Sequence, residues 1–170
     1  LESLEVTTLN LTGVPAAEES VAPRSLRLAD LPGTPTIRTK PLRLTKTEVG
    51  ELTLSLALPP NHHFTADAGS RWQVIADEDS PLLIEEAKAS GSLEKNKTIR
   101  IPVRLNSNTN DGLLRVEALA YFCENEGPCK VSGVLFEVPV ALGLTPGGTV
   151  DLNHTLGKNP DPFNPSTDGG

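Results

Sequence analysis

DGLLRVEALAYFCENEGPCKVSGVLFEVPVAL, residues 111–142, contains two apolar runs of alternating polarity on either side of a short acidic loop. Because successive side chains of a strand point to opposite faces of a sheet, a period of two predicts a strand with one buried face. The stretch therefore predicts two strands that flank a loop carrying both cysteines. The side chains expected on the buried faces are those of Leu114, Val116, Ala118, Ala120 and Phe122, and of Val134, Phe136, Val138 and Val140.

The same period of two recurs earlier in the chain. The runs that show it are residues 51–58, 71–77 and 98–106, with weaker signals at 42–44 and 80–86. Pro102 cannot donate a hydrogen bond to a neighbouring strand, so we expect its strand at a sheet edge or with a bulge. Gly, Pro and Asn clusters separate the runs, and no helical period is sustained. The pattern predicts an all-β fold, an antiparallel two-sheet β-sandwich.

Proline and glycine content divides the chain into three parts. Residues 1–39 begin with one strand-like run, LEVTTLNL, and continue as a proline-rich segment without a period, which is typical of a linker. Residues 40–143 are expected to form the sandwich, with residues 61–70 and 89–97 as loops rich in turn-forming residues. Residues 144–170 predict a flexible tail that is disordered beyond about Thr155.

Charge and motif content exclude several classes of function. The chain has 15 Lys and Arg against 22 Asp and Glu, a net charge of -7, whereas a nucleic-acid binder needs a basic face. Because no run of about 18 apolar residues is present, we expect no direct membrane span. A phosphate loop, a paired-acid motif and a Ser-His-Asp order are all absent, so we expect neither an enzyme nor a cofactor.

Three roles are open to Cys123 and Cys129. Cys123 ends one predicted strand and Cys129 stands just before the next, so the geometry permits a disulfide. A bridge that closes about seven residues would contribute roughly 2.4 kcal/mol of stability, less any strain. The other roles are a metal ligand pair and a redox-active pair.

The histidines supply the further ligands that a metal site would need. Zinc usually takes four ligands, with two to four residues between paired cysteines. Five residues separate Cys123 and Cys129, and His62, His63 and His154 are the only candidates to add, so we expect no metal site. His62 and His63 are expected in an exposed loop, where they could respond to acidification of their compartment. With Arg71, they are our candidates for binding a partner.

Charged residues beside the cysteines give a direction to the redox hypothesis. Glu124 and Glu126 should disfavour a thiolate at Cys123, whereas Lys130 should favour one at Cys129. The better-stabilised thiolate leaves more easily, so a thioredoxin-like partner is expected to attack Cys123 and release Cys129.

Three segments together resemble one protein family: LALPPNHHFTADAGSRWQV (56–74), TIRIPVRLN (98–106) and the 111–142 stretch. They resemble the C-terminal β domain of proteins that join a thioredoxin-like domain to an NHL-repeat propeller. The likeness covers about residues 40–143 and includes the C-x5-C pair between two apolar strands, with Val-Pro after the second. LEVTTLNLTGVP is similar to the segment that closes the last propeller blade, so residues 1–39 would comprise a propeller strand and a linker.

The resemblance implies a non-catalytic β-sandwich whose partners are the thioredoxin-like and propeller domains of the same parent protein. Cys123 and Cys129 match the family's cysteine pair. In plant members these domains lie in the chloroplast thylakoid lumen, and the assembly looks like a negative regulator of photoprotective energy dissipation. Another lumenal protein is a further candidate partner, and the cytosol and a bacterial extracytoplasmic space are alternative locations.

Two other functions compete with this redox-linked regulatory domain. One is a structural or protein-binding sandwich whose cysteines only brace a hairpin. The other is an independent hydrolase or oxidoreductase, which the missing nucleophile and base disfavour.

Overall fold

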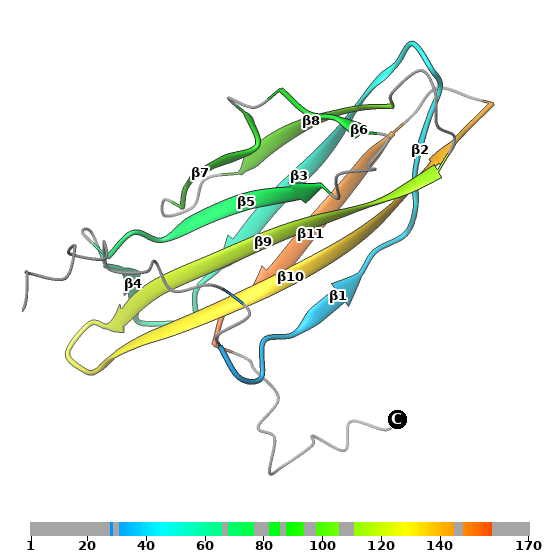
Figure 1. Ribbon diagram of the computed structural model, residues 1–170. Coiled ribbons are helices and arrows are strands. Elements are labelled where there is room, and N and C mark those ends of the chain that lie inside the picture. Colours follow the sequence, from blue (N-terminus) through cyan, green and yellow to red (C-terminus); the bar gives the residue numbers. More distant parts are fainter. Residues whose placement is uncertain are drawn as a thin grey trace, which may run out of the picture.

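The computed structural model describes residues 28, 31–65, 68–76, 82–85, 88–93, 98–105, 111–144 and 148–157. This part of the chain is nearly all strand and forms two sheets, which Figure 1 shows one behind the other. A single cluster of buried side chains from both sheets lies between them. The fold is the β-sandwich that the periodicity predicts.

The larger sheet contains both long strands of the 111–142 stretch. Its order is β1-β10-β9-β5-β7, with β2 also paired to β10 and β4 also paired to β9. The strands are β1 (Thr36–Arg38), β2 (Leu42–Leu44), β4 (His62–Phe64), β5 (Arg71–Ala76), β7 (Ser90–Ser92), β9 (Asp111–Glu124) and β10 (Cys129–Leu142).

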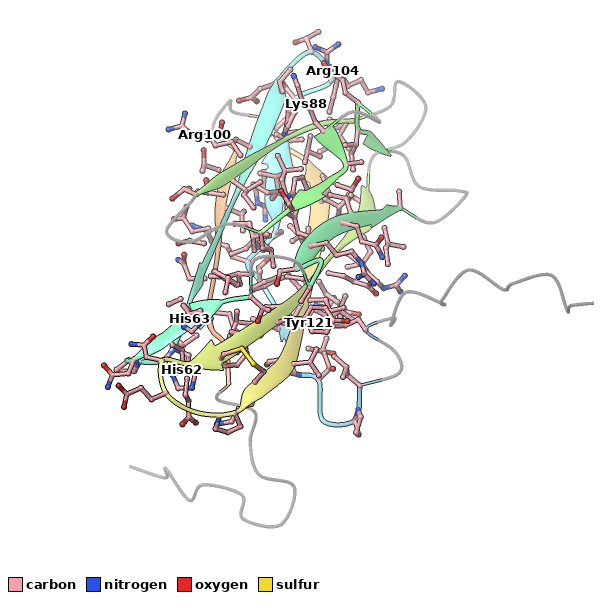
Figure 2. All side chains as sticks on the ribbon, turned by 90° about the vertical axis from the view of Figure 1, so that its left-hand side faces the viewer. His62, His63, Lys88, Arg100, Arg104 and Tyr121 are labelled. Carbon is pink, nitrogen blue, oxygen red and sulfur yellow. A yellow bond between two sulfur atoms is a disulfide. The ribbon has the colours of Figure 1, made fainter. Side chains whose placement is uncertain are left out.

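The smaller sheet has the order β11-β3-β8-β6. Its strands are β3 (Val49–Ala57), β6 (Leu82–Leu83), β8 (Ile99–Leu105) and β11 (Thr149–Thr155). On β8, Ile101 and Val103 are buried while Arg100 and Arg104 point outward, as Figure 2 shows for the two arginines. β8 lies between β3 and β6, so it is not the edge strand that we expected from Pro102. β6 pairs with β8 only at Arg104 and Leu105, so no described strand flanks Pro102 itself on that side and its missing N–H is tolerated.

Both sheets are mixed, which corrects the purely antiparallel arrangement that we expected. β1 and β2 run parallel to β10, and β11 runs parallel to β3. Tight turns produce antiparallel neighbours, but these three strands reach their partners through longer connections, which allow the parallel direction. Short sequence runs give no sign of such distant pairing.

The alternating residues of β9 and β10 fill the core as predicted. Each side chain expected on the inner face, from Leu114 to Phe122 and from Val134 to Val140, is at most 1% exposed. Trp72 of β5 is 6% exposed and belongs to the same cluster, which agrees with a packing role. Because burial of apolar area is the main favourable term in folding, the inner face of this hairpin makes a large contribution to the stability of the domain.

The sandwich extends beyond the range expected for it. β1 lies within residues 1–39, which we assigned to the propeller strand and linker, and β11 lies within residues 144–170, which we assigned to the tail. β11 is held there because Val150, Leu152 and Leu156 are buried. The predicted strand at 4–11 and the segment beyond residue 157 lie outside the described residues.

Two expected loops contain short strands. β4 lies within residues 61–70 and β7 within residues 89–97. Each pairs with a longer strand, β4 with β9 and β7 with β5, over three residue pairs. Pairing to an existing strand edge supplies the backbone hydrogen bonds that these polar segments could not organise alone.

Candidate functional site: a disulfide at the end of the long hairpin

Cys123 and Cys129 form a disulfide, with their Cα atoms 3.9 Å apart. They face each other across the β9–β10 ladder, at the end nearest the turn. The Glu124 N–H donates to the Pro128 carbonyl oxygen, so the adjacent cysteine pair occupies a position without ladder hydrogen bonds, where facing side chains come closest. The two sulfurs are therefore bonded, which both the structural role and the redox-active role require.

The two sulfur-bearing residues differ in exposure. Cys123 is 8% exposed, whereas Cys129 is exposed. The difference follows from the strand order, because β4 pairs with β9 at His63 and Cys123. On the outer side of β10, β1 begins to pair only at Leu135, so no described strand lies beside Cys129.

Thr65 is a site residue that the sequence analysis did not identify. Its Oγ1 lies 3.2 Å from Cys123 Sγ, and because a disulfide sulfur carries no hydrogen, the hydroxyl is the donor. Its N–H donates to the Tyr121 carbonyl oxygen at 2.9 Å, which holds Thr65 beside β9. No local motif marks this threonine, since strand pairing brings it to the cysteine.

Lys130 and Glu124 pair with each other at the same end of the hairpin. Lys130 Nζ lies 2.8 Å from Glu124 Oε1, and this hydrogen bond and charge lower the pKa of the Glu124 carboxyl. Side chains alternate along a strand, so Lys130 points to the opposite face of β10 from Cys129. Glu126 is exposed in the turn. The effect of Glu124, Glu126 and Lys130 on the two cysteine thiols stays a prediction.

The two neighbouring histidines lie beside the hairpin end, as Figure 2 shows. His62 Nδ1 donates to the Pro60 carbonyl oxygen at 2.8 Å, and its Nε2 lies 3.7 Å from Glu124 Oε1. His63 Nδ1 lies 3.0 Å from Asn125 Oδ1. An open hollow of about 530 Å³ follows this edge, lined by Pro60, Asn61, His62, Glu124, Asn125 and Glu126.

Arg71 does not join this cluster. It stands opposite Leu119 on β9 and opposite Ser92 on β7, in a different part of the larger sheet. Its role in partner binding, like that of His62 and His63, remains a prediction.

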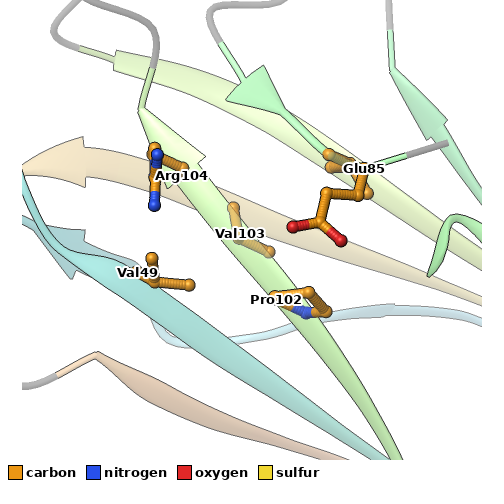
Figure 3. Close-up of a pocket in the computed structure, with 6 residues that line it drawn as sticks. Val49, Glu85, Pro102, Val103 and Arg104 are labelled. Carbon is orange, nitrogen blue, oxygen red and sulfur yellow. The ribbon is translucent and has the colours of Figure 1, made fainter. Parts of the chain in front are cut away.

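Across the described ranges, no group of three or more His, Cys, Asp or Glu side chains could hold a metal ion, and no helix is long and apolar enough to cross a membrane. A second hollow, of about 330 Å³, is shown in Figure 3 and lined by Val49, Ile84, Glu85, Pro102, Val103 and Arg104. It contains none of the predicted site residues.

Fold and site together define a β-sandwich domain with a cross-strand disulfide at an open corner. The chain is 25% identical over 140 residues to the protein Suppressor of quenching 1, chloroplastic, of Arabidopsis thaliana, in an alignment that covers 81% of this chain and 13% of that protein. It is 25% identical over 145 residues to NHL repeat-containing protein 2 of Gallus gallus, with coverage of 78% and 20%.

These comparisons show a distant relationship. No family model matches the chain. The chain spans a fifth or less of the length of these two curated relatives, and neither name denotes an enzyme.

Proposed function

We propose that this chain is a non-catalytic, redox-linked regulatory domain whose Cys123–Cys129 disulfide exchanges with a thioredoxin-like dithiol. The observation that carries the proposal is the placement of the bridge. One sulfur-bearing residue is exposed at an open strand end, outside the apolar cluster that lies between the sheets. An exposed disulfide is accessible to an attacking thiolate, whereas one buried between sheets is not.

The relatives suggest the setting in which such a domain works. On the family resemblance of the sequence, the thioredoxin-like and propeller domains of a common parent protein would be the partners, with another lumenal protein as a further candidate. The name of the plant relative places that protein in the chloroplast, which supports the same location for this chain. The family resemblance would make the location the thylakoid lumen and the process negative regulation of photoprotective energy dissipation.

A redox titration tests the proposal. The chain is equilibrated with thiol buffers of graded potential, alkylated, and its free thiols are counted by mass spectrometry. We expect reversible reduction with a midpoint close to that of thioredoxin, about −270 mV. A midpoint well below about −300 mV is typical of structural disulfides and would contradict exchange with such a partner.

One observation favours a second candidate, a purely structural brace. The bridge lies at the turn end of a hairpin that already pairs in register from Cys123 to Asp111, where it would prevent fraying. For a brace, replacement of both cysteines by serine should lower the free energy of unfolding by at most roughly 2.4 kcal/mol and leave partner binding unchanged.

A further inference from the structure

We propose that the exchange begins at Cys129 Sγ, that Cys123 is the leaving thiolate, and that the Thr65 hydroxyl stabilises this thiolate. The inference rests on the proposed function and specifies its order. It reverses the order that the neighbouring charges predict from sequence.

Access to the two sulfurs supports this order. A thiolate displaces a disulfide sulfur in line, so it must approach the attacked sulfur from the side opposite the bond that breaks. For Cys129 that side is the outer edge of β10, where no described strand pairs before Leu135. For Cys123 it is the side of β9 that β4 and Thr65 occupy.

The backbone direction reinforces the difference. Glu124 and Pro128 form the hydrogen-bonded pair next to the cysteines, so the N–H and C=O of Cys129 point away from β9. The Leu135 N–H, an even number of residues further along, donates to the Pro35 carbonyl oxygen on that outer side. An extended segment of a partner would therefore find backbone hydrogen-bonding groups beside the exposed cysteine.

Thr65 provides a reason for Cys123 to leave. Its hydroxyl already lies within hydrogen-bonding distance of Cys123 Sγ in the disulfide. A hydrogen bond to the charged form of a group favours that form, so the contact should strengthen as negative charge develops on the sulfur. Thr65 is a positioning residue in this scheme and forms no covalent bond.

The charges of Lys130 and Glu124, which predicted attack at Cys123 and release of Cys129, are arranged unfavourably for that order. The Lys130 ammonium is hydrogen bonded to Glu124 Oε1 and points to the other face of β10 from Cys129. Its charge is therefore partly compensated and directed away from the sulfur that it was expected to stabilise.

The reaction balances with a dithiol as reductant. The partner's thiolate forms a bond to Cys129 Sγ, the bond between Cys129 and Cys123 breaks, and Cys123 Sγ takes the electron pair. The partner's second thiolate then attacks the partner's first sulfur in the mixed disulfide and releases Cys129 as a thiolate. Two electrons pass to this chain, which gains two thiols after protonation, and the partner becomes the disulfide.

Trapping identifies the attacked sulfur. The full chain is mixed with a thioredoxin whose resolving cysteine is replaced by serine, quenched at short times with an alkylating reagent, and mapped by peptide mass spectrometry. We expect the thioredoxin adduct on Cys129 and the alkyl label on Cys123. An adduct on Cys123 with the label on Cys129 would overturn the order and leave the proposed function intact. No adduct on either cysteine would overturn both.

A threonine variant tests the stabilising hydroxyl. In a Cys129→Ser background, the pH dependence of Cys123 alkylation gives the pKa of that thiol. We expect Thr65→Val to raise it by about one unit, equivalent to a roughly tenfold loss of thiolate at neutral pH, and Thr65→Ser to restore it. An unchanged pKa in Thr65→Val, or no recovery in Thr65→Ser, would exclude this role. A purely structural threonine would leave the thiol pKa unmoved in a folded variant.

Discussion

Gly91 of β7 lies against the ring of Trp72, and the contact leaves no space for a side chain. A Cβ atom at this position would lie 2.9 Å from Trp72 Nε1 and 3.2 Å from its Cε2. Because this tryptophan belongs to the core, we expect Gly91→Ala to lower the free energy of unfolding by about 1–3 kcal/mol, measured by urea denaturation. Ser90→Ala, at an exposed neighbour, should change it by less than about 0.5 kcal/mol. Equal effects of the two variants would contradict the packing argument.

His154 of β11 makes a pH-dependent contribution to the free energy of unfolding. Burial lowers the pKa of this imidazole below 6.5, and its Nε2 is buried with no hydrogen-bond partner among the residues that the structure describes. The unfolded chain therefore binds the proton more readily, so this contribution to stability is complete above pH 6.5 and is lost as the pH falls below it.

We expect His154→Phe to remove this part of the pH dependence. At neutral pH it should also raise the free energy of unfolding by about 1 kcal/mol, because no buried nitrogen remains unpaired. His154→Gln, which does not titrate but stays polar, should remove the pH dependence without that gain. Urea denaturation at neutral and mildly acidic pH checks both, and variants that keep the parent's decline in stability would exclude His154 as its source.

At the scale of elements, the disulfide secures one end of the β9–β10 hairpin. We expect reduction to accelerate amide hydrogen exchange about tenfold at Glu124 and Asn125, whose N–H groups donate to Pro128 and Asn61 at this end. Val116, buried near the middle of β9, should keep its protection. Hydrogen exchange followed by NMR measures this, and loss of protection along all of β9 would mean that the bridge supports the whole sheet.

The long strands could be predicted because each carries its own signal. β9 and β10 alternate over many residues, and β8 does so over seven. β4 and β7 could not be predicted, because three-residue segments rich in Ser, Gly and His become strands only by pairing with β9 and β5. The parallel direction of β11 likewise depends on the position of β3, which lies far away in the sequence.

At the scale of the whole molecule, the site depends on the same distant pairings. The cysteine pair is evident in the sequence because Cys123 and Cys129 lie on adjacent strands. The role of Thr65 is not evident in the sequence, because its hydroxyl contacts Cys123 Sγ only when β4 pairs with β9. The difference in exposure between the two cysteines follows from the order of β4, β9 and β10 across the sheet, which no local pattern contains.

The C-terminal limit of the folding unit is a property of the whole molecule and can be tested by truncation. A chain that ends at residue 143, the limit expected from composition, lacks β11 and the buried side chains of Val150, Leu152 and Leu156. Each such side chain contributes about 1.5–3 kcal/mol, and a typical domain has only about 5–15 kcal/mol in total. We therefore expect this chain to lose cooperative thermal unfolding, measured by circular dichroism, whereas a chain that ends at residue 157 keeps it. Cooperative unfolding of the shorter chain at the parent's midpoint would show that β3 needs no parallel partner.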